Sequence, residues 1–251
     1  MTRRRWIADT WDEVTATLTG EQAAHLIRVL RVQPGMEYDI VAGDRVCHAV
    51  IAGITGDTVR FNLVADVPSQ PALPVTLLLA VFKFDRMEWA IEKATELGVA
   101  RIIPVITRRS EKHLAQAAPK RTERWRRIAR EAAQQSRRSD VPVVEEAISL
   151  RAAVKRESSA ARFVLAEQER TTTLRDALDQ ALTQTLKEST GSARDESPEL
   201  HIAIGPEGGW AAEEEALFDA EGWRPVSLGP RILRAETAAI TALAITAAML
   251  E

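Results

Sequence analysis

Two glycine-containing loops near the C-terminus hold the residues best suited to chemistry. The first, GPEGG at 205–209, follows the apolar run 200–204, and the second, LGPRILRAET at 228–237, leads into a long apolar helix. Glycine lets a backbone turn sharply and approach a ligand closely. In the second loop Arg234 could stabilise developing negative charge and Glu236 could accept a proton. The two loops together predict a ligand site, whereas GPEGG alone is also typical of a turn that enters a helix.

The elements that must position these loops form an alternating pattern after Pro74. Apolar residues recur at helical spacing over 87–97 and again over 125–133. Apolar runs predict strands at 75–81, 101–106, 162–166, 200–204 and 225–228. Strands that alternate with helices indicate an α/β fold with a mostly parallel sheet covered on both faces.

A different pattern precedes three closely spaced prolines, Pro68, Pro71 and Pro74, which mark the best domain boundary. Short strands are expected on the N-terminal side of these prolines, at 38–41, 46–54 and 58–64. Gly-Asp turns between such strands indicate a small barrel. The chain is therefore expected to contain two domains.

One helix is expected within this N-terminal part. Thr19 and Gln22 have the spacing of a capping box for a helix that runs to Arg31. Its predicted apolar stripe consists of Ala23, Leu26, Ile27 and Leu30. The opposite face carries His25, Arg28 and Arg31 and is therefore expected to be polar.

Composition restricts the class of protein. With 251 residues and 45% hydrophobic content, the chain can bury a substantial core. The single cysteine, Cys47, excludes an internal disulfide, and with four scattered histidines we expect no metal site. The N-terminus has no apolar signal segment, and no run of eighteen apolar residues occurs, so we expect a cytoplasmic protein without membrane spans.

The net charge of -3 does not exclude a nucleic-acid partner, because the basic residues are clustered. Residues 101–138 contain twelve Lys or Arg against three Glu, a local excess of nine positive charges. Screening acts over about 8 Å at physiological salt. A phosphate backbone would therefore respond to this segment more than to acidic residues elsewhere.

Several strings along the whole chain, in this order, resemble the RsmE family of 16S ribosomal RNA uridine N3-methyltransferases, members of the SPOUT superfamily. They are HLIRVLR at 25–31, KFDRMEW at 83–89, KATELGV at 93–99, ERW at 123–125, EAAQQS at 131–136 and the two loops. The resemblance implies an α/β fold with a SPOUT-type trefoil-knotted parallel-sheet domain at 74–251. It also implies a small PUA-like β-barrel domain that binds RNA at 1–70.

The family's activity, S-adenosylmethionine-dependent methylation of uridine N3 in 16S ribosomal RNA, is the function that the resemblance implies. The family target is uracil-1498 near the decoding site, methylated during small-subunit maturation. The cofactor, S-adenosyl-L-methionine, would be held by residues of the knot loops and the strands before them. These residues are Leu165, Ile204, Gly205, Pro206, Glu207, Gly208, Gly209, Leu228, Gly229, Ile232, Leu233, Ala235 and Thr237.

Uracil N3 carries a proton that must be removed before it can accept a methyl group. Arg234 is the first candidate to stabilise the resulting anion, and Glu236 or Glu207 could accept the proton. A carboxylate at a loop–helix junction is also a common stabiliser of the helix N-terminus. One departure from the family pattern is Ala211, where a Ser or Thr often caps the next helix, and it predicts weaker capping by about 1 kcal/mol.

The expected partners are 16S ribosomal RNA or the assembled small subunit, and a second copy of the chain, paired through the apolar helix at 236–250. Candidate RNA contacts lie on the predicted polar helix face, in the N-terminal tail and on the helix around Trp125. They are Arg3, Arg5, His25, Arg28, Arg31, Arg127, Arg130 and Arg138. The alternative interpretation of these residues is a solvated basic surface.

Two other functions also fit the residues. Another SPOUT activity, such as ribose 2′-O-methylation, would use the same loops on a different nucleophile. A ribosome-assembly factor that binds RNA without catalysis would need the basic residues but not the cofactor.

Overall fold

The computed structural model describes residues 5–188 and 198–250, and the chain divides into two compact units. The first unit runs to Ala72 and also includes Glu131–Val141. The second unit comprises Leu73–Arg130 and the residues from Pro142 onward. The division after Ala72 lies within the predicted proline-rich boundary, whereas the return of 131–141 to the first unit has no counterpart in the local sequence pattern.

The first unit is built on a six-stranded sheet in the order β1-β4-β5-β6-β3-β2. β1 and β4 are parallel, and the other neighbours are antiparallel. Its core contains Leu18, Ile40, Ile51 and Phe61, which are buried on alternating strand positions. The strands are β1 (Trp6–Ile7), β2 (Thr10–Trp11), β3 (Thr15–Leu18), β4 (Glu37–Ala42), β5 (Arg45–Thr55) and β6 (Thr58–Asp66).

The predicted helix before Arg31 exists, but its start and end differ from the expectation. α1 (Gly20–Ala24) continues as the π-helix η1 (His25–Val29). The capping box is wrong, because the Thr19 hydroxyl and backbone N–H both donate to the Asp9 carboxylate, at 3.0 and 2.8 Å. The apolar stripe is wrong at Leu30, which is exposed. A π-turn places more residues in each turn than an α-helix, so it rotates Leu30 away from the core.

The second unit contains a parallel sheet in the order β10-β8-β7-β12-β11-β13, with the short β9 paired to β8. Neighbouring strands of this sheet all run parallel to one another. The five predicted strands are confirmed as β7 (Leu73–Ala80), β8 (Val99–Ile106), β11 (Ala161–Leu165), β12 (Leu200–Ile204) and β13 (Arg224–Val226). The two-residue strands β9 (Val143–Val144) and β10 (Ile148–Ser149) were not predicted.

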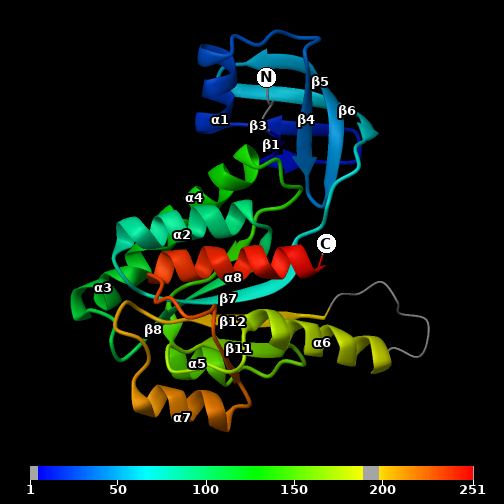
Figure 1. Ribbon diagram of the computed structural model, residues 1–251. Coiled ribbons are helices and arrows are strands. Elements are labelled where there is room, and N and C mark those ends of the chain that lie inside the picture. The colour runs from blue at the N-terminus through cyan, green and yellow to red at the C-terminus, as the bar shows by residue number, and fades with distance from the viewer. Residues whose placement is uncertain (1–4, 189–197, 251) are drawn as a thin grey trace. The chain divides into compact units, whose positions relative to one another are not determined.

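Helices cover both faces of this sheet (Figure 1). α2 and α8 pack on one face and α6 packs on α8, while α5 and α7 lie on the other face. Their bounds are α2 (Phe84–Glu96), α3 (Lys112–Ala117), η2 (Ala118–Arg121), α4 (Thr122–Gln135), α5 (Leu150–Val154), α6 (Leu174–Glu188), α7 (Ala212–Ala220) and α8 (Ala235–Leu250).

Strand periodicity decides which side chains meet which helices. Leu78, Val164 and Ala203 point to the same face and pack with Phe218 and Trp223 in one buried cluster. The intervening residues of the same strands point to the opposite face, as a period of two requires. Both faces of the central strands are therefore apolar, as expected for a parallel sheet covered on both sides.

Candidate functional site

Three neighbouring strands of the second unit end at one edge of the sheet, and the segments that follow them line a cleft. β13, β11 and β12 are adjacent and parallel, so their carboxyl ends lie together. Residues of 165–170, 204–210 and 226–235 line this cleft, which has a volume of about 330 Å³. Open parallel sheets bind ligands outside the carboxyl ends of their strands. This edge is therefore the candidate site.

The structure brings nearly all the predicted cofactor residues together. The cleft is lined by every one of them except Thr237, which is exposed on the first turn of α8. The segment 166–170 also lines the cleft, and sequence reasoning missed it because it contains no glycine. Its position directly after the predicted strand 162–166 was the available signal.

The glycine loop is shaped by a buried indole. Trp210 Nε1 donates to the Leu165 carbonyl at 2.8 Å, which ties the loop after β12 to the end of β11. A Cβ atom at Gly205 would lie 3.2 Å from Trp210 Cε2, so a side chain there would crowd the ring. Gly209 and Gly229 have φ of +69° and +109°, which side chains rarely adopt. Glycine at these positions thus gives the cleft its backbone walls.

Glu214 supports the start of α7 in place of a capping side chain at Ala211. Its Oε2 accepts from the Ala211 backbone N–H at 2.9 Å, and its Oε1 accepts from the Arg108 backbone N–H at 2.7 Å. The carboxylate is buried. It therefore joins the loop after β8 to the helix that follows the glycine loop, and it provides the N3 contact of a capping box, whereas Ala211 provides no side-chain cap.

Arg109 is a residue of the cleft that the sequence analysis did not single out. It lines the cleft, and its Nη1 donates to the Gly208 carbonyl. A Cβ atom at Gly208 would meet Arg109 Cδ at 3.4 Å. The TRRSE string at 107–111 follows a predicted strand, as do the other loops of the site, and this position was the signal that could have found it.

The segment 166–170 is held by an ionised carboxylate. Hydrogen bonds from the Thr171 hydroxyl and from the backbone N–H groups of Thr172 and Thr171 lower the pKa of Glu169 to about 2. The turn is therefore formed with Glu169 in its charged form at neutral pH. This leaves a fixed negative charge beside the cleft.

The predicted catalytic residues have different positions. Arg234 and Glu207 line the cleft, whereas Glu236 is buried in the first turn of α8 and does not line it. Arg86 of α2 lies near both carboxylates: its Nη1 is 3.7 Å from Glu207 Oε1, and its Nε is 3.8 Å from Glu236 Oε1. Arg86 belongs to one of the strings that carry the family resemblance, but the sequence predicted no role for it.

Residues 68–247 match the family model described as the RNA methyltransferase domain. The ribosomal RNA small subunit methyltransferase E of Synechocystis is 35% identical over 240 residues, which cover 95% of this chain and 75% of that protein. The Bacillus subtilis protein of the same name is 32% identical, covering 91% of this chain and 88% of its own. This chain belongs to the RsmE family of RNA methyltransferases.

Solved structures of RsmE-like proteins have the same fold over the whole chain. The Neisseria gonorrhoeae methyltransferase E bound to S-adenosyl methionine superposes with a TM-score of 0.80 at 28% identity, covering 99% of this chain and 98% of that one. The putative methyltransferase Lpg2936 of Legionella pneumophila, with bound SAM, gives 0.81 at 27% identity and the same coverage. The predicted fold class is confirmed by this likeness and by the two sheets.

Several of the residues predicted to contact RNA in the first unit of this RsmE-family chain interact with other groups of the protein. His25 is half-buried with its ring 5.8 Å from that of Trp6, and Arg28 forms an exposed ion pair with Asp57 at 3.2 Å. Arg5 Nη1 donates to the Arg137 carbonyl at 2.6 Å. Arg31 is exposed with φ of +51°. Arg3 lies outside the described residues.

The RNA-contact residues predicted near Trp125 differ from one another in exposure. Arg127 is exposed and Arg130 is half-buried on α4, while Trp125 itself is buried. Arg138 differs from the expectation: its side chain is 8% exposed, and its Nη2 lies 2.6 Å from Asp140 Oδ2. A buried guanidinium with a carboxylate partner is poorly placed for phosphate, so we leave Arg138 out of the RNA-binding set.

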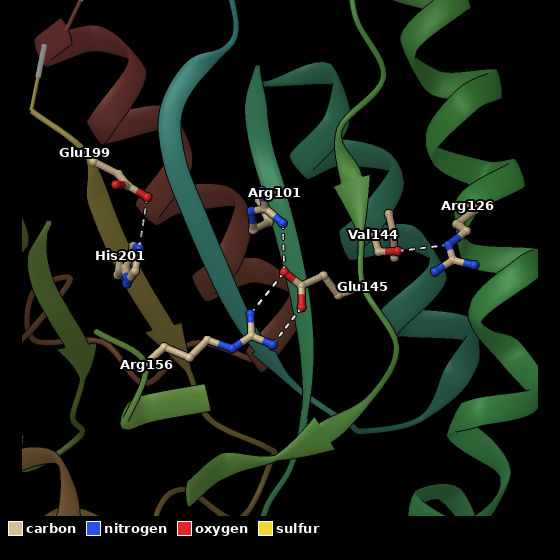
Figure 2. Close-up of polar contacts among 7 residues, drawn as sticks. All are labelled: Arg101, Arg126, Val144, Glu145, Arg156, Glu199 and His201. Atoms are coloured by element: carbon tan, nitrogen blue, oxygen red, sulfur yellow. Dashed lines mark hydrogen bonds and ion pairs between the residues drawn. The ribbon is translucent and has the colours of Figure 1, made fainter. Parts of the chain in front are cut away.

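A second polar cluster, drawn in Figure 2, includes residues near the amino ends of β8 and β12, and none of its members lines the cleft. Glu145 accepts from Arg156 through both oxygens, at 2.8 and 3.0 Å, and from Arg101 at 2.8 Å. His201 of β12 is drawn in the same view, and its Nε2 lies 3.2 Å from Glu199 Oε1. These contacts lie at one end of the sheet, and none of their residues lines the cleft.

No membrane-crossing helix and no cluster of three or more metal-ligating side chains occurs among the described residues.

Proposed function

We propose that this chain transfers the methyl group of S-adenosylmethionine to N3 of a uridine in 16S ribosomal RNA, with the family target uracil-1498, during small-subunit maturation. One observation carries the proposal. The cleft at the ends of β11, β12 and β13 is walled by glycine loops in a chain whose solved relatives of the same fold bind that cofactor. Under this proposal residues 74–251 are the methyltransferase domain and residues 1–70 a PUA-like RNA-binding domain.

The residues of the cleft fit the cofactor. Gly205, Gly209 and Gly229 carry no side chain of their own, so their backbone groups can approach a ligand in the cleft. The same cleft is lined by apolar side chains, which suit the apolar parts of a nucleoside and a thioether. These side chains are Leu165, Ile204, Leu228, Ile232 and Leu233. When bound, S-adenosylmethionine would supply a methyl group on a positively charged sulfur.

The chain's own part in the reaction is to hold the base and to remove its N3 proton. The Arg234 guanidinium, beside the cleft, would stabilise negative charge on the uracil carbonyl oxygens. A carboxylate would accept the proton. Alignment of the two reactants contributes as well, since fixed orientation supplies about 7 to 11 kcal/mol in favourable cases.

RNA binding would use exposed arginines of both units, among them Arg28, Arg31 and Arg127. We also propose that the chain forms a homodimer through α8, whose exposed positions include the small residues Thr237, Ala244 and Ala248. Small side chains allow close approach of a second helix. Sedimentation at micromolar concentration tests this, and a fully active monomer would contradict it.

The direct test is nucleoside mass spectrometry after incubation with S-adenosylmethionine. The substrates are purified small subunits and naked 16S ribosomal RNA from cells that lack this protein. We expect N3-methyluridine in the digest, and none with an Arg234→Ala variant that still binds the cofactor by calorimetry. Ribose 2′-O-methylation would identify the other SPOUT activity. RNA binding without cofactor affinity would identify an assembly factor.

A further inference from the structure

An arginine from outside the two loops connects them. Arg86 belongs to α2, Glu207 to the loop after β12 and Glu236 to the first turn of α8. The Arg86 guanidinium lies 3.7 Å from the Glu207 carboxylate and 3.8 Å from the Glu236 carboxylate. Both separations exceed the roughly 2.7–2.9 Å of a charged hydrogen bond, so the link is an electrostatic one.

The two carboxylates differ in their access to solvent. The Glu236 side chain is 7% exposed, whereas those of Glu207 and Arg86 are 35% and 31% exposed. Glu236 Oε2 is buried and has no hydrogen-bond partner among the described residues. A buried ionised carboxylate is costly without an opposite charge nearby. Arg86 supplies that charge, and Glu236 in return anchors the guanidinium.

The Glu207 and Glu236 carboxylates also differ in their position relative to the cleft. Glu207 lines the cleft and Glu236 does not. A base bound in the cleft can therefore reach Glu207, while the buried oxygens of Glu236 are closed to it. The two carboxylates that appeared equivalent in the sequence are thus unequal in the structure.

We propose that Glu207 is the proton acceptor, and that Arg86, anchored by Glu236, is a positioning residue that holds the Glu207 carboxylate at the edge of the cleft. This inference rests on the proposed function. In the step, the N3–H bond breaks and its proton passes to Glu207. The N3 electron pair forms the bond to the methyl carbon, and the methyl–sulfur bond breaks with its electron pair remaining on sulfur.

A double-variant cycle tests the assignment, with single-turnover methylation measured at saturating RNA and cofactor. We expect Glu207→Gln to slow transfer by about 100-fold and Arg86→Gln by about ten-fold, since a positioned base contributes about 10²–10⁴. Arg86→Lys should restore part of the rate. Because Arg86 acts through Glu207, the double variant should be no slower than Glu207→Gln alone.

Lys93→Gln is the matched control, because it removes one positive charge from the same helix at a residue that pairs with Glu92 and Glu96 and not with Glu207 or Glu236. Its rate should equal that of the wild type. Calorimetric cofactor affinity should stay within about two-fold in the Arg86 variants and in Lys93→Gln, because neither position lines the cleft. If Arg86→Gln does not fold, Glu236→Gln takes its place in the same cycle.

Three results would overturn the inference. They are a wild-type rate for Glu207→Gln, a wild-type rate for Arg86→Gln, and rate losses that multiply in the double variant, which would indicate a purely structural ion pair. Failure of the proposed function looks different. In that case the wild-type protein itself forms no N3-methyluridine.

Discussion

At Gly229 the backbone has a φ of +109° in the wall of the cleft, and no heavy atom within 4 Å would meet an added Cβ atom. Any effect of a side chain there must therefore come from backbone conformation. At Gly205 the reverse holds, because the obstacle is the Trp210 ring at 3.2 Å. The two glycines are required for different physical reasons.

Gly229→Ala should weaken the binding of S-adenosylmethionine by about ten-fold or more, because a strained φ costs roughly 1–3 kcal/mol and the loop relaxes to avoid it. Calorimetric titration measures the affinity. Gly53→Ala, at a glycine without positive φ and without close neighbours, is the control and should bind normally. Unchanged affinity in Gly229→Ala would remove this loop from the cofactor site.

At the scale of elements, the start of α7 depends on a residue three positions inside the helix. Glu214 satisfies backbone N–H groups of Ala211 and Arg108, which are far apart in sequence. The buried carboxylate thus connects two loops of the site and also provides the N3 contact of a capping box.

Glu214→Ala should lower the free energy of unfolding by about 2 kcal/mol, because it leaves two backbone donors without their acceptor. The exposed Glu213→Ala is the control and should change stability by less than about 0.5 kcal/mol. Urea unfolding at neutral pH measures both. Equal effects in the two variants would show that the buried carboxylate has no special role.

His201 makes the sheet end in Figure 2 sensitive to pH. Burial lowers the pKa of His201 below its usual 6.5, against the raising effect of Glu199, and Arg162 and Arg101 lower it further. The folded state therefore favours the neutral ring. Stability from this group is fully present above about pH 6.5 and is lost as the pH falls through the lower pKa of the folded state.

The consequence is measurable with His201→Gln, which cannot be protonated in this range. Wild-type protein should lose unfolding free energy between about pH 7.5 and about pH 5, and the variant should lose less. Urea titrations at both pH values give the difference. An identical loss in both proteins would place the pH sensitivity elsewhere.

At the scale of the whole molecule, the overall charge of -3 conceals a separation of charge along the chain. Arg28 and Arg31 are exposed in the first unit, and Arg127 is exposed in the second. Arg138 belongs to the same basic segment as Arg127, yet its charge is compensated by Asp140. Only the exposed positions can release counterions from a phosphate backbone.

Charge removal at Arg28, Arg31 and Arg127 should weaken RNA binding and flatten its salt dependence. The logarithmic slope should fall by roughly 0.7–0.9 for each phosphate that an arginine no longer neutralises. Arg101→Gln, at the Glu145 cluster, is the control and should leave the slope unchanged. Filter binding at several salt concentrations measures both. A slope that stays at the wild-type value in the triple variant would contradict this mode of RNA binding.

The five central strands and the positions of the two glycine loops followed from sequence alone, because apolar runs and glycine act through local backbone preferences. The predicted cofactor residues came from the family resemblance, and apart from Thr237 they line one cleft. The order of those strands in the sheet and the return of 131–141 to the first unit involve contacts between distant segments. Local patterns contain no signal for them, and the capping box at Thr19 failed because Asp9 competes for its hydroxyl.

Tertiary structure alone decided which charged side chains meet at the cleft and beside its carboxylates. Local sequence gives no partner for Arg86 or Arg109, and packing brings Arg86 to Glu207 and Glu236 and Arg109 to Gly208. Burial likewise distinguishes the two carboxylates, because Glu236 is buried outside the cleft lining whereas Glu207 lines the cleft. The sequence specifies the charge of a side chain, but its burial and its partner arise only when distant segments pack together. Burial and partner then determine what the charge can do.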